Sequence, residues 1–350
     1  MKLIKLTCIS VLLFSAFAAC KKGGGGGGTG GDTTTKTKTS TLDTPIYKGA
    51  DISWVTQMED SGRKFYNAAG TATDCFQLMQ SLDINVIRLR VWVNPTGGWC
   101  GTRDVVNKAL RARALGQRVL LDFHYSDTWA DPGHQTKPAA WANDDLPTLV
   151  STVTSYTKGV LDTLKAAGVV PSWVQVGNEV DNGMLWPNGQ ASDSMANFAA
   201  LVTAGYKAVK AVSDTTKVIV HVSNGWNNSL FRWVFDGLTA NNAQFDIIGM
   251  SLYPADAWQS YNDSCATNMS DMVSRYHKPV MICEVGMPES EASNCEAFLT
   301  DLIHKVRAVP NQQGLGVFYW EPESYNWQSY GLGAFDNTGK PTVAMNAFSN

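Results

Sequence analysis

The chain has 350 residues, of which 44% are apolar, and a formal net charge of −3 at pH 7. This charge excludes the basic surface expected of a nucleic-acid-binding protein, so no nucleic-acid partner is predicted. The length is sufficient for one large domain or two ordinary ones. Twelve Trp residues are many; most Trp side chains belong to cores, but those exposed in a cleft suit sugars.

The first 45 residues do not read as part of a fold. Residues 1–20 combine Lys2 and Lys5 with an apolar run and then small residues, which is typical of a secretory signal peptide. Their end, "FAAC", resembles a bacterial lipobox, which implies a lipid on Cys20. Residues 21–45 are a Gly- and Thr-rich tether without means of forming a core. We therefore expect an exported lipoprotein of a Gram-negative outer membrane, facing the periplasm or the outside, with a domain over 46–350.

Short apolar strands alternate with helical patterns throughout the rest of the chain. Eight strands rich in Val and Ile, each followed by a helix, predict an all-parallel sheet covered by helices. With about 300 residues the closed (β/α)8 TIM barrel is the natural α/β architecture, and a doubly wound open sheet is second because no Gly-rich dinucleotide fingerprint is present. The strands are predicted at 49–55, 85–93, 118–126, 173–180, 217–223, 245–254, 279–286 and 316–322, and helices at 72–82, 104–116, 149–168, 196–212 and 296–309.

Two of these strands end on carboxylates. "WVQVGNEV" finishes with Asn178 and Glu179, and "PVMICEVG" carries Glu284. Barrel active sites gather where the strands end. Strict alternation would point Glu179 and Glu284 into the barrel mouth, with Gln175 and Ile282 on the same faces. It would leave Met281 and Cys283 under the helical shell.

Glycoside hydrolysis requires at least two carboxyl groups on opposite sides of one active site. One group protonates the leaving oxygen, and the other attacks or stabilises the anomeric carbon. We expect Arg90 and Tyr253 to hold Glu284 ionised, and Glu179 to keep its proton. Asn178 can donate to a sugar hydroxyl. A structural salt bridge is the competing explanation for either Glu taken alone.

The segments "LLDFHYSDTWADPGHQTKPAAW", "VGNEVDNGMLWPNG" and "FYWEP" resemble glycoside hydrolase family 53, the endo-β-1,4-galactanases of clan A. The resemblance spans nearly all of 47–350 and implies a retaining double displacement on β-1,4-galactan, with Glu179 as acid/base and Glu284 as nucleophile. It places the cleft-lining positions at Asp51, Arg90, Trp92, His124, Asn178, Tyr253 and Trp320. Some bacterial members carry calcium between late loops, but the spacing of a calcium site is not evident here, so no metal or cofactor is predicted. A monomer is expected.

Three other functions remain open. A mannanase or cellulase of the same clan would share the catalytic pair. A non-catalytic glycan-binding barrel is the alternative from another class, although both carboxylates are present. A metal-dependent hydrolase is disfavoured, because the five His residues are scattered. Trp226 and Trp327 are further candidates for stacking on sugar, with core packing at least as good an explanation.

Five cysteines follow Cys20, so at least one thiol is free if disulfides form. Cys265 with Cys295, and Cys75 with Cys100, could bridge neighbouring loops. Cys283 is the candidate for a buried free thiol.

Overall fold

The computed structural model describes residues 46–254 and 257–349. These residues belong to one compact unit, Ser40–Asn350. The predicted signal peptide, the lipid-carrying Cys20 and the tether lie outside the described residues, so all three stay predictions.

The core of the unit is a closed barrel of eight parallel strands, in the order β1-β10-β9-β8-β7-β6-β5-β4. Each predicted strand is present, and the TIM barrel prediction is confirmed. A two-stranded hairpin, β2 (Phe65–Tyr66) with β3 (Ala72–Thr73), lies outside the barrel sheet. The barrel strands are β1 (Tyr47–Asp51), β4 (Val86–Val91), β5 (Arg118–Phe123), β6 (Trp173–Val176), β7 (Lys217–Val222), β8 (Ile247–Leu252), β9 (Val280–Val285) and β10 (Gly314–Trp320).

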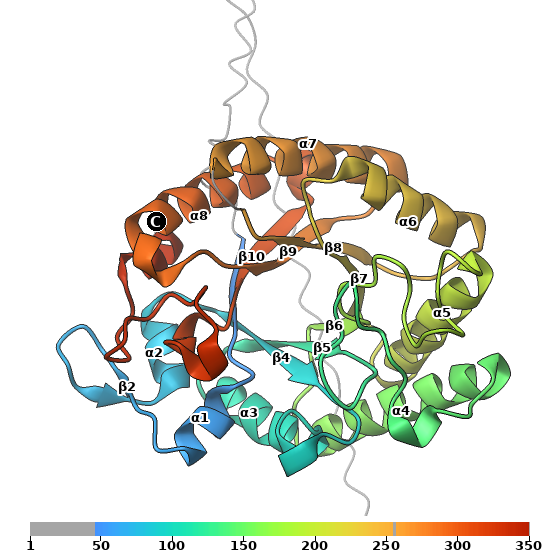
Figure 1. Ribbon diagram of the computed structural model, residues 1–350, viewed down its shortest axis with the longest axis horizontal. Helices are drawn as coiled ribbons and strands as arrows, with labels where there is room; N and C mark the ends of the chain where they lie inside the picture. Colours follow the sequence, from blue (N-terminus) through green and yellow to red (C-terminus); the bar gives the residue numbers. More distant parts are fainter. Residues whose placement is uncertain (1–45, 255–256, 350) are drawn as a thin grey trace, which may run out of the picture. The chain divides into compact units, whose positions relative to one another are not determined.

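Helices surround the strands on the outside (Figure 1). The five predicted helices are present, together with three more: α1 precedes α2 in the connection from β1 to β4, α6 connects β7 to β8, and α7 connects β8 to β9. Several begin at a side-chain cap: Asp74, Asp145, Ser194 and Asn227 each accept a hydrogen bond from a backbone N–H of the first turn. The helices are α1 (Val55–Asp60), α2 (Cys75–Ser81), α3 (Thr102–Ala114), α4 (Leu146–Ala166), α5 (Met195–Val212), α6 (Asn228–Ala240), α7 (Trp258–Tyr276) and α8 (Ala292–Arg307). None of the described helices is long and apolar enough to cross a membrane.

The barrel interior has an apolar layer below and a polar layer above. The apolar layer is a separate buried cluster that includes Val86, Leu120, Trp173, Ile219 and Phe318. Two residues further along four of these strands, on the same face, stand buried polar side chains, namely Arg88, Asp122, Gln175 and His221. The functional groups therefore rest on a packed floor near the carboxyl ends of the strands.

Strand β9 departs from the predicted alternation. Met281 and Cys283 belong to the barrel-interior cluster, whereas Ile282 packs in the outer core under the helices. The prediction for these three residues was therefore wrong. The pairing with β8 shifts by one residue, from Met250 opposite Ile282 to the next pair, in which Glu284 is the β9 partner. This irregularity turns Glu284 inward although Cys283, its neighbour, also faces inward.

All five described cysteines are buried and free, so the two considered pairings are wrong. Cys265 and Cys295 lie within α7 and α8, not in loops that could meet, and Cys283 is a buried free thiol as predicted. We expect denatured protein from which residues 1–45 have been removed to release five thiols per chain in a titration with a chromogenic disulfide. A count of one or three would contradict the structure.

Candidate active site

The segment after β6 presents Glu179 through a turn and not through strand alternation. Strand β6 ends at Val176, and the next residue, Gly177, has φ +87°. A Cβ atom there would lie 2.5 Å from Val180 Cγ1, so a side chain is excluded. Glu179 itself has φ +44°, a conformation that costs free energy and gathers at functional sites. The prediction that these polar residues continue the strand was wrong, but the side chain still reaches the barrel mouth.

Glu179 and Glu284 line the same cavity of about 230 Å³ at the carboxyl ends of the strands. Four of the predicted cleft residues line it with them, namely His124, Asn178, Tyr253 and Trp320. Trp129, Ala130 and Asp131 from the loop after β5 complete the wall. The two carboxyl groups thus face a common space, which is what paired acid chemistry requires.

Glu284 has two compensating partners. Its Oε1 is 2.8 Å from Arg88 Nη2, and its Oε2 accepts a hydrogen bond from the Tyr253 hydroxyl at 2.9 Å. The cation that pairs with Glu284 is therefore Arg88, where we had expected Arg90. Burial raises the pKa of Glu284 to about 7, against the lowering effect of Arg88.

Glu179 lacks such a partner. It is half-buried at the cavity, and no ion pair to its carboxylate is found among residues 46–254 and 257–349. Burial, followed by the negative charge of Glu284, raises the pKa of Glu179 well above its ordinary value. Arg88 pairs with Glu284 and not with Glu179, so Glu179 is the member of the pair that we expect to hold the proton, as a general acid does.

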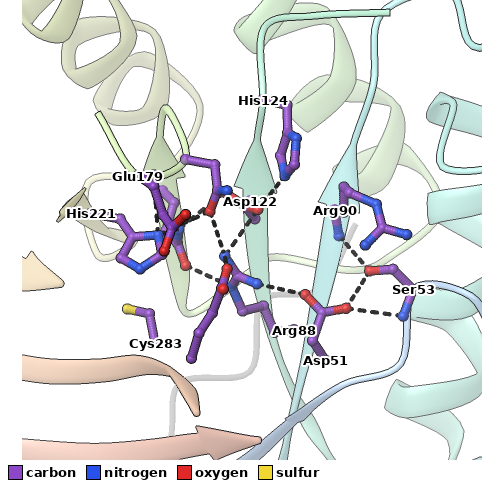
Figure 2. A network of polar contacts seen from close by, with 12 residues as sticks. Asp51, Ser53, Arg88, Arg90, Asp122, His124, Glu179, His221 and Cys283 are labelled. Atoms are coloured by element: carbon purple, nitrogen blue, oxygen red, sulfur yellow. Dashed lines mark hydrogen bonds and ion pairs between the residues drawn. The ribbon is translucent and has the colours of Figure 1, made fainter. Parts of the chain in front are cut away.

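Arg88 is the hub of the polar layer (Figure 2). Its guanidinium contacts Asp51 Oδ2 at 2.7 Å and Asp122 Oδ2 at 3.0 Å, in addition to Glu284. It also donates to Gln175 Oε1 at 2.8 Å and Asn178 Oδ1 at 3.0 Å. Asp51 is fully buried and stands behind the cavity wall, so the structure gives it a supporting position and no surface for substrate.

Arg90 likewise lies behind the wall. It is 1% exposed and pairs with Glu321 at 2.9 Å. Its guanidinium carbon stands 4.2 Å from the ring centroid of Trp129 and 5.0 Å from that of Trp92. Arg90 therefore orders aromatic side chains by cation–π contact.

Five aromatic side chains are in contact beside the cavity. We call this group the aromatic wall and define it as Trp54, Trp92, Trp129, Trp320 and Tyr330. Edge-to-face contacts join its members, with ring centroids 5.1 Å apart for Trp92 and Trp129 and 5.8 Å apart for Trp129 and Trp320. Trp92 lies next to the cavity, and Trp320 lines it. Sequence analysis did not single out Trp129, whose position inside a long loop gave no periodic signal.

His124 and Asn178 are held in fixed orientations. The Ala130 backbone N–H donates to His124 Nδ1 at 2.9 Å, so the ring proton is on Nε2 and faces Asp122 at 2.9 Å. Asn178 Nδ2 donates to the Ala130 carbonyl at 2.8 Å. No second partner of Nδ2 is found among the described residues, so its other hydrogen can donate to a ligand.

Two further predictions concern Trp226 and Trp327 as sugar-stacking residues and the absence of a bound metal. Trp226 is 40% exposed and contacts Tyr261, and Trp327 stacks near Arg63; neither lines the cavity. No three His, Cys, Asp or Glu side chains of the described residues gather in a way that could hold a metal ion. In the loop after β10, Glu321 is already engaged by Arg90. The absence of a metal and of a cofactor stays a prediction.

Comparison with known proteins identifies the family. Residues 47–348 match the model of "Glycosyl hydrolase family 53". The chain belongs to this family. A probable arabinogalactan endo-β-1,4-galactanase A of Aspergillus terreus is 38% identical over 301 residues, covering 79% of this chain and 85% of the relative. An arabinogalactan endo-β-1,4-galactanase of Thermothelomyces thermophilus is 31% identical over 315 residues, covering 83% and 94%.

Solved structures agree with the family 53 assignment. A chain from a study of two fungal β-1,4-galactanases superposes with a TM-score of 0.81 at 30% identity, covering 87% of this chain and all of that one. The family 53 catalytic domain of Ignisphaera aggregans gives the same TM-score at 28% identity. The family match includes every residue of the cavity and confirms the prediction of a glycoside hydrolase. The roles of individual residues stay predictions.

Proposed function

We propose that this family 53 protein is a retaining endo-β-1,4-galactanase. The observation that carries the proposal is the asymmetric pair in one cavity: Glu284 is held by Arg88 and Tyr253, while the pKa of Glu179 is raised by burial and by Glu284. The named relatives are galactanases, which supports β-1,4-galactan as the substrate. A mannanase or cellulase would use the same pair, and a binding-only barrel would not need the asymmetry.

The reaction is a double displacement. Glu284 attacks the anomeric carbon while Glu179 gives its proton to the departing O4, which leaves a galactosyl group on Glu284. Water, deprotonated by Glu179, then releases the product with retained configuration. This mechanism expects carboxyl groups roughly 5–5.5 Å apart, whereas inversion would need roughly 6.5–9.5 Å.

The function is tested by incubating the protein with linear β-1,4-galactan, mannan and carboxymethyl-cellulose side by side. We expect reducing ends from galactan, internal cuts early in the reaction, and β-configured products by proton NMR before mutarotation. Cleavage of mannan or cellulose in preference to galactan, or α-configured first products, would overturn the proposal. Oligosaccharide binding without any cleavage would favour the binding-only barrel.

The pH profile of kcat/KM follows from the pair. The nucleophile must be ionised, so activity should rise with pH along a limb displaced from the ordinary glutamate value toward 7, the raised pKa of Glu284. The acid must be protonated, so activity should fall again at higher pH as Glu179 loses its proton. An acid limb near the ordinary glutamate value of about 4.3 would contradict the burial of Glu284.

We further infer an exported lipoprotein, tethered by residues 21–45. The support is the sequence alone: the basic and apolar residues 1–19, and Cys20 after small residues. In a Gram-negative host the protein should partition with membranes, and Cys20→Ser should abolish this partitioning. Equal recovery of both forms in the soluble fraction would disprove the anchor.

A further inference from the structure

A pocket at the end of the barrel opposite the active site has no role in the mechanism above. Its volume is about 710 Å³, against about 230 Å³ for the catalytic cavity. We call it the amino-terminal pocket, because the first residues of five barrel strands line it: Tyr47, Arg118, Trp173, Lys217 and Ile247. Trp173 and Ile247 also belong to the apolar layer of the barrel interior. This layer therefore separates the amino-terminal pocket from the polar groups of the active site.

The amino-terminal pocket carries an excess of positive charge. Arg118, Lys217 and Lys278 line it, and none of the three forms an ion pair within the part of the chain that the structure describes. The one carboxylate among the lining residues, Asp246, is already paired with Lys210 at 2.8 Å. The chain as a whole has a formal charge of −3, so this accumulation of cations is a local feature.

Folding alone does not explain these cations. Lys278 follows the carboxyl end of α7, where the helix dipole stabilises a positive charge. Arg118 and Lys217 instead begin strands and are exposed, and like charges without counter-ions oppose the compact state. The Arg118 guanidinium lies 5.3 Å from the ring centroid of Tyr47 and 6.0 Å from that of Trp173. These contacts order the guanidinium but leave its charge unneutralised, so the pocket suits an anion.

The predicted tether joins the barrel at this end. Ile46, the first described residue, lines a second pocket of about 460 Å³ that shares three lining residues with the amino-terminal pocket. Residues 21–45 precede it directly, and the predicted lipid-carrying Cys20 is followed by Lys21 and Lys22. A Gly-rich chain of this length has an end-to-end distance of roughly 25–30 Å. A lipid on Cys20 would therefore keep the bilayer close to this end of the barrel.

We propose that the amino-terminal pocket and its cations form a contact surface for anionic phospholipid headgroups, which holds the barrel with its active site turned away from the membrane. The headgroup phosphates supply the counter-ions that Arg118, Lys217 and Lys278 lack. Val170, an apolar side chain that also lines the pocket and is 50% exposed, suits the boundary between headgroups and acyl chains. The catalytic cavity lies at the other ends of the strands, where a polysaccharide can approach from the side away from the bilayer.

The setting of this contact rests on the proposed lipoprotein anchor, whereas the contact surface itself does not. Attraction between exposed charges weakens with salt, since the screening length is only about 8 Å at physiological ionic strength. The contact therefore orients a protein that the lipid already holds, and it does not retain a protein without lipid. This agrees with the loss of membrane partitioning expected for Cys20→Ser.

The test measures the binding of the lipid-free chain, residues 21–350, to vesicles at low ionic strength. This chain contains the whole compact unit. Vesicles of equal parts phosphatidylglycerol and phosphatidylcholine are compared with vesicles of phosphatidylcholine alone, and we expect binding to the anionic vesicles only. The triple variant Arg118→Ser/Lys217→Ser/Lys278→Ser should bind them roughly tenfold to hundredfold more weakly, because each cation near an anionic surface contributes about fivefold in affinity.

Lys64→Ser/Arg103→Ser/Lys340→Ser is the matched control, because it removes the same number of positive charges near the carboxyl ends of the strands. Arg103 lies in the first turn of α3, and the Lys64 carbonyl accepts a hydrogen bond from Tyr325 in the loop after β10. This variant should bind anionic vesicles nearly as the wild type does. Both triple variants should cleave galactan at wild-type rates, because none of the six residues lines the catalytic cavity.

The orientation has a readout of its own. A polarity-sensitive fluorophore is attached to Thr215→Cys, an exposed position of the amino-terminal pocket. A second protein carries it at Ser293→Cys, an exposed position in the first turn of α8 near the carboxyl ends of the strands. The described native cysteines are all buried, so the label goes to the new thiol. Only the probe at position 215 should respond to anionic vesicles.

Three outcomes overturn the inference: no binding of the wild type to anionic vesicles, equal weakening by the two triple variants, or a probe response at position 293 and not at 215. If the pocket variant does not fold, Lys217→Glu alone reverses one exposed charge, and unchanged binding of this variant also overturns the inference. These outcomes leave the other proposals standing. Galactan cleavage by the wild type tests the galactanase, and the partitioning of Cys20→Ser tests the anchor.

Discussion

Glu284→Gln is expected to lower kcat on galactan by a factor on the order of 10⁴–10⁶, the range found when one member of a catalytic triad is removed. The amide has the shape of the carboxyl group but cannot attack the anomeric carbon, so no galactosyl intermediate forms. Steady-state rates of reducing-end release measure the effect. Glu291→Gln, which neutralises an exposed carboxylate in the next loop, is the matched control and should keep wild-type activity.

The same variant should fold normally. Because folding raises the pKa of Glu284 to about 7, ionisation of this group opposes folding, and the opposition grows as pH rises from its unfolded value through 7. Gln lacks this cost, so the stability of the variant relative to the wild type should increase between pH 4 and pH 8. Substantial residual activity in a folded variant would show that Glu284 is not the nucleophile.

The barrel could be predicted from the alternation of apolar strands with helices, and most of the cavity from the polar residues at strand ends together with the family resemblance. Arg88, Asp122 and Gln175 each follow an inward apolar residue by two positions, so their inward direction is a matter of counting. Counting failed where the backbone departs from a regular strand. The register shift in β9 reverses the assignment of Cys283, and the left-handed Gly177 ends β6 before Glu179.

Pairing inside the barrel could not be predicted by alternation at all. Arg88 and Arg90 stand on one strand and one face, yet the first pairs with Glu284 and the second with Glu321. Which carboxylate each guanidinium pairs with depends on its position along the barrel axis relative to the neighbouring strands. Trp129 was missed for a related reason: its loop brings it over Arg90, and loops carry no periodicity.

Arg88→Met is expected to lower the free energy of unfolding by about 3–5 kcal/mol, the usual cost of breaking a buried ion pair by removing one partner. The methionine fills much of the volume, but it leaves Asp51, Asp122 and Glu284 within one buried cluster without the cation that stands 2.7–3.0 Å from each of them. The carboxylates must then take up protons or water, and both responses disturb the cavity.

The loss of Arg88 should lower activity because it changes the pKa of Glu284. Without the guanidinium, burial and the two aspartates all act to raise the pKa of Glu284 further, so the acid limb of kcat/KM should move to higher pH. Denaturant unfolding and a pH profile measure the two effects, with Arg103→Met on the exposed face of α3 as control. Wild-type stability together with an unmoved acid limb would show that the charge of Arg88 is dispensable. That result would contradict the role inferred from the polar layer, in which the Arg88 guanidinium contacts the buried Asp51 and Asp122 as well as Glu284.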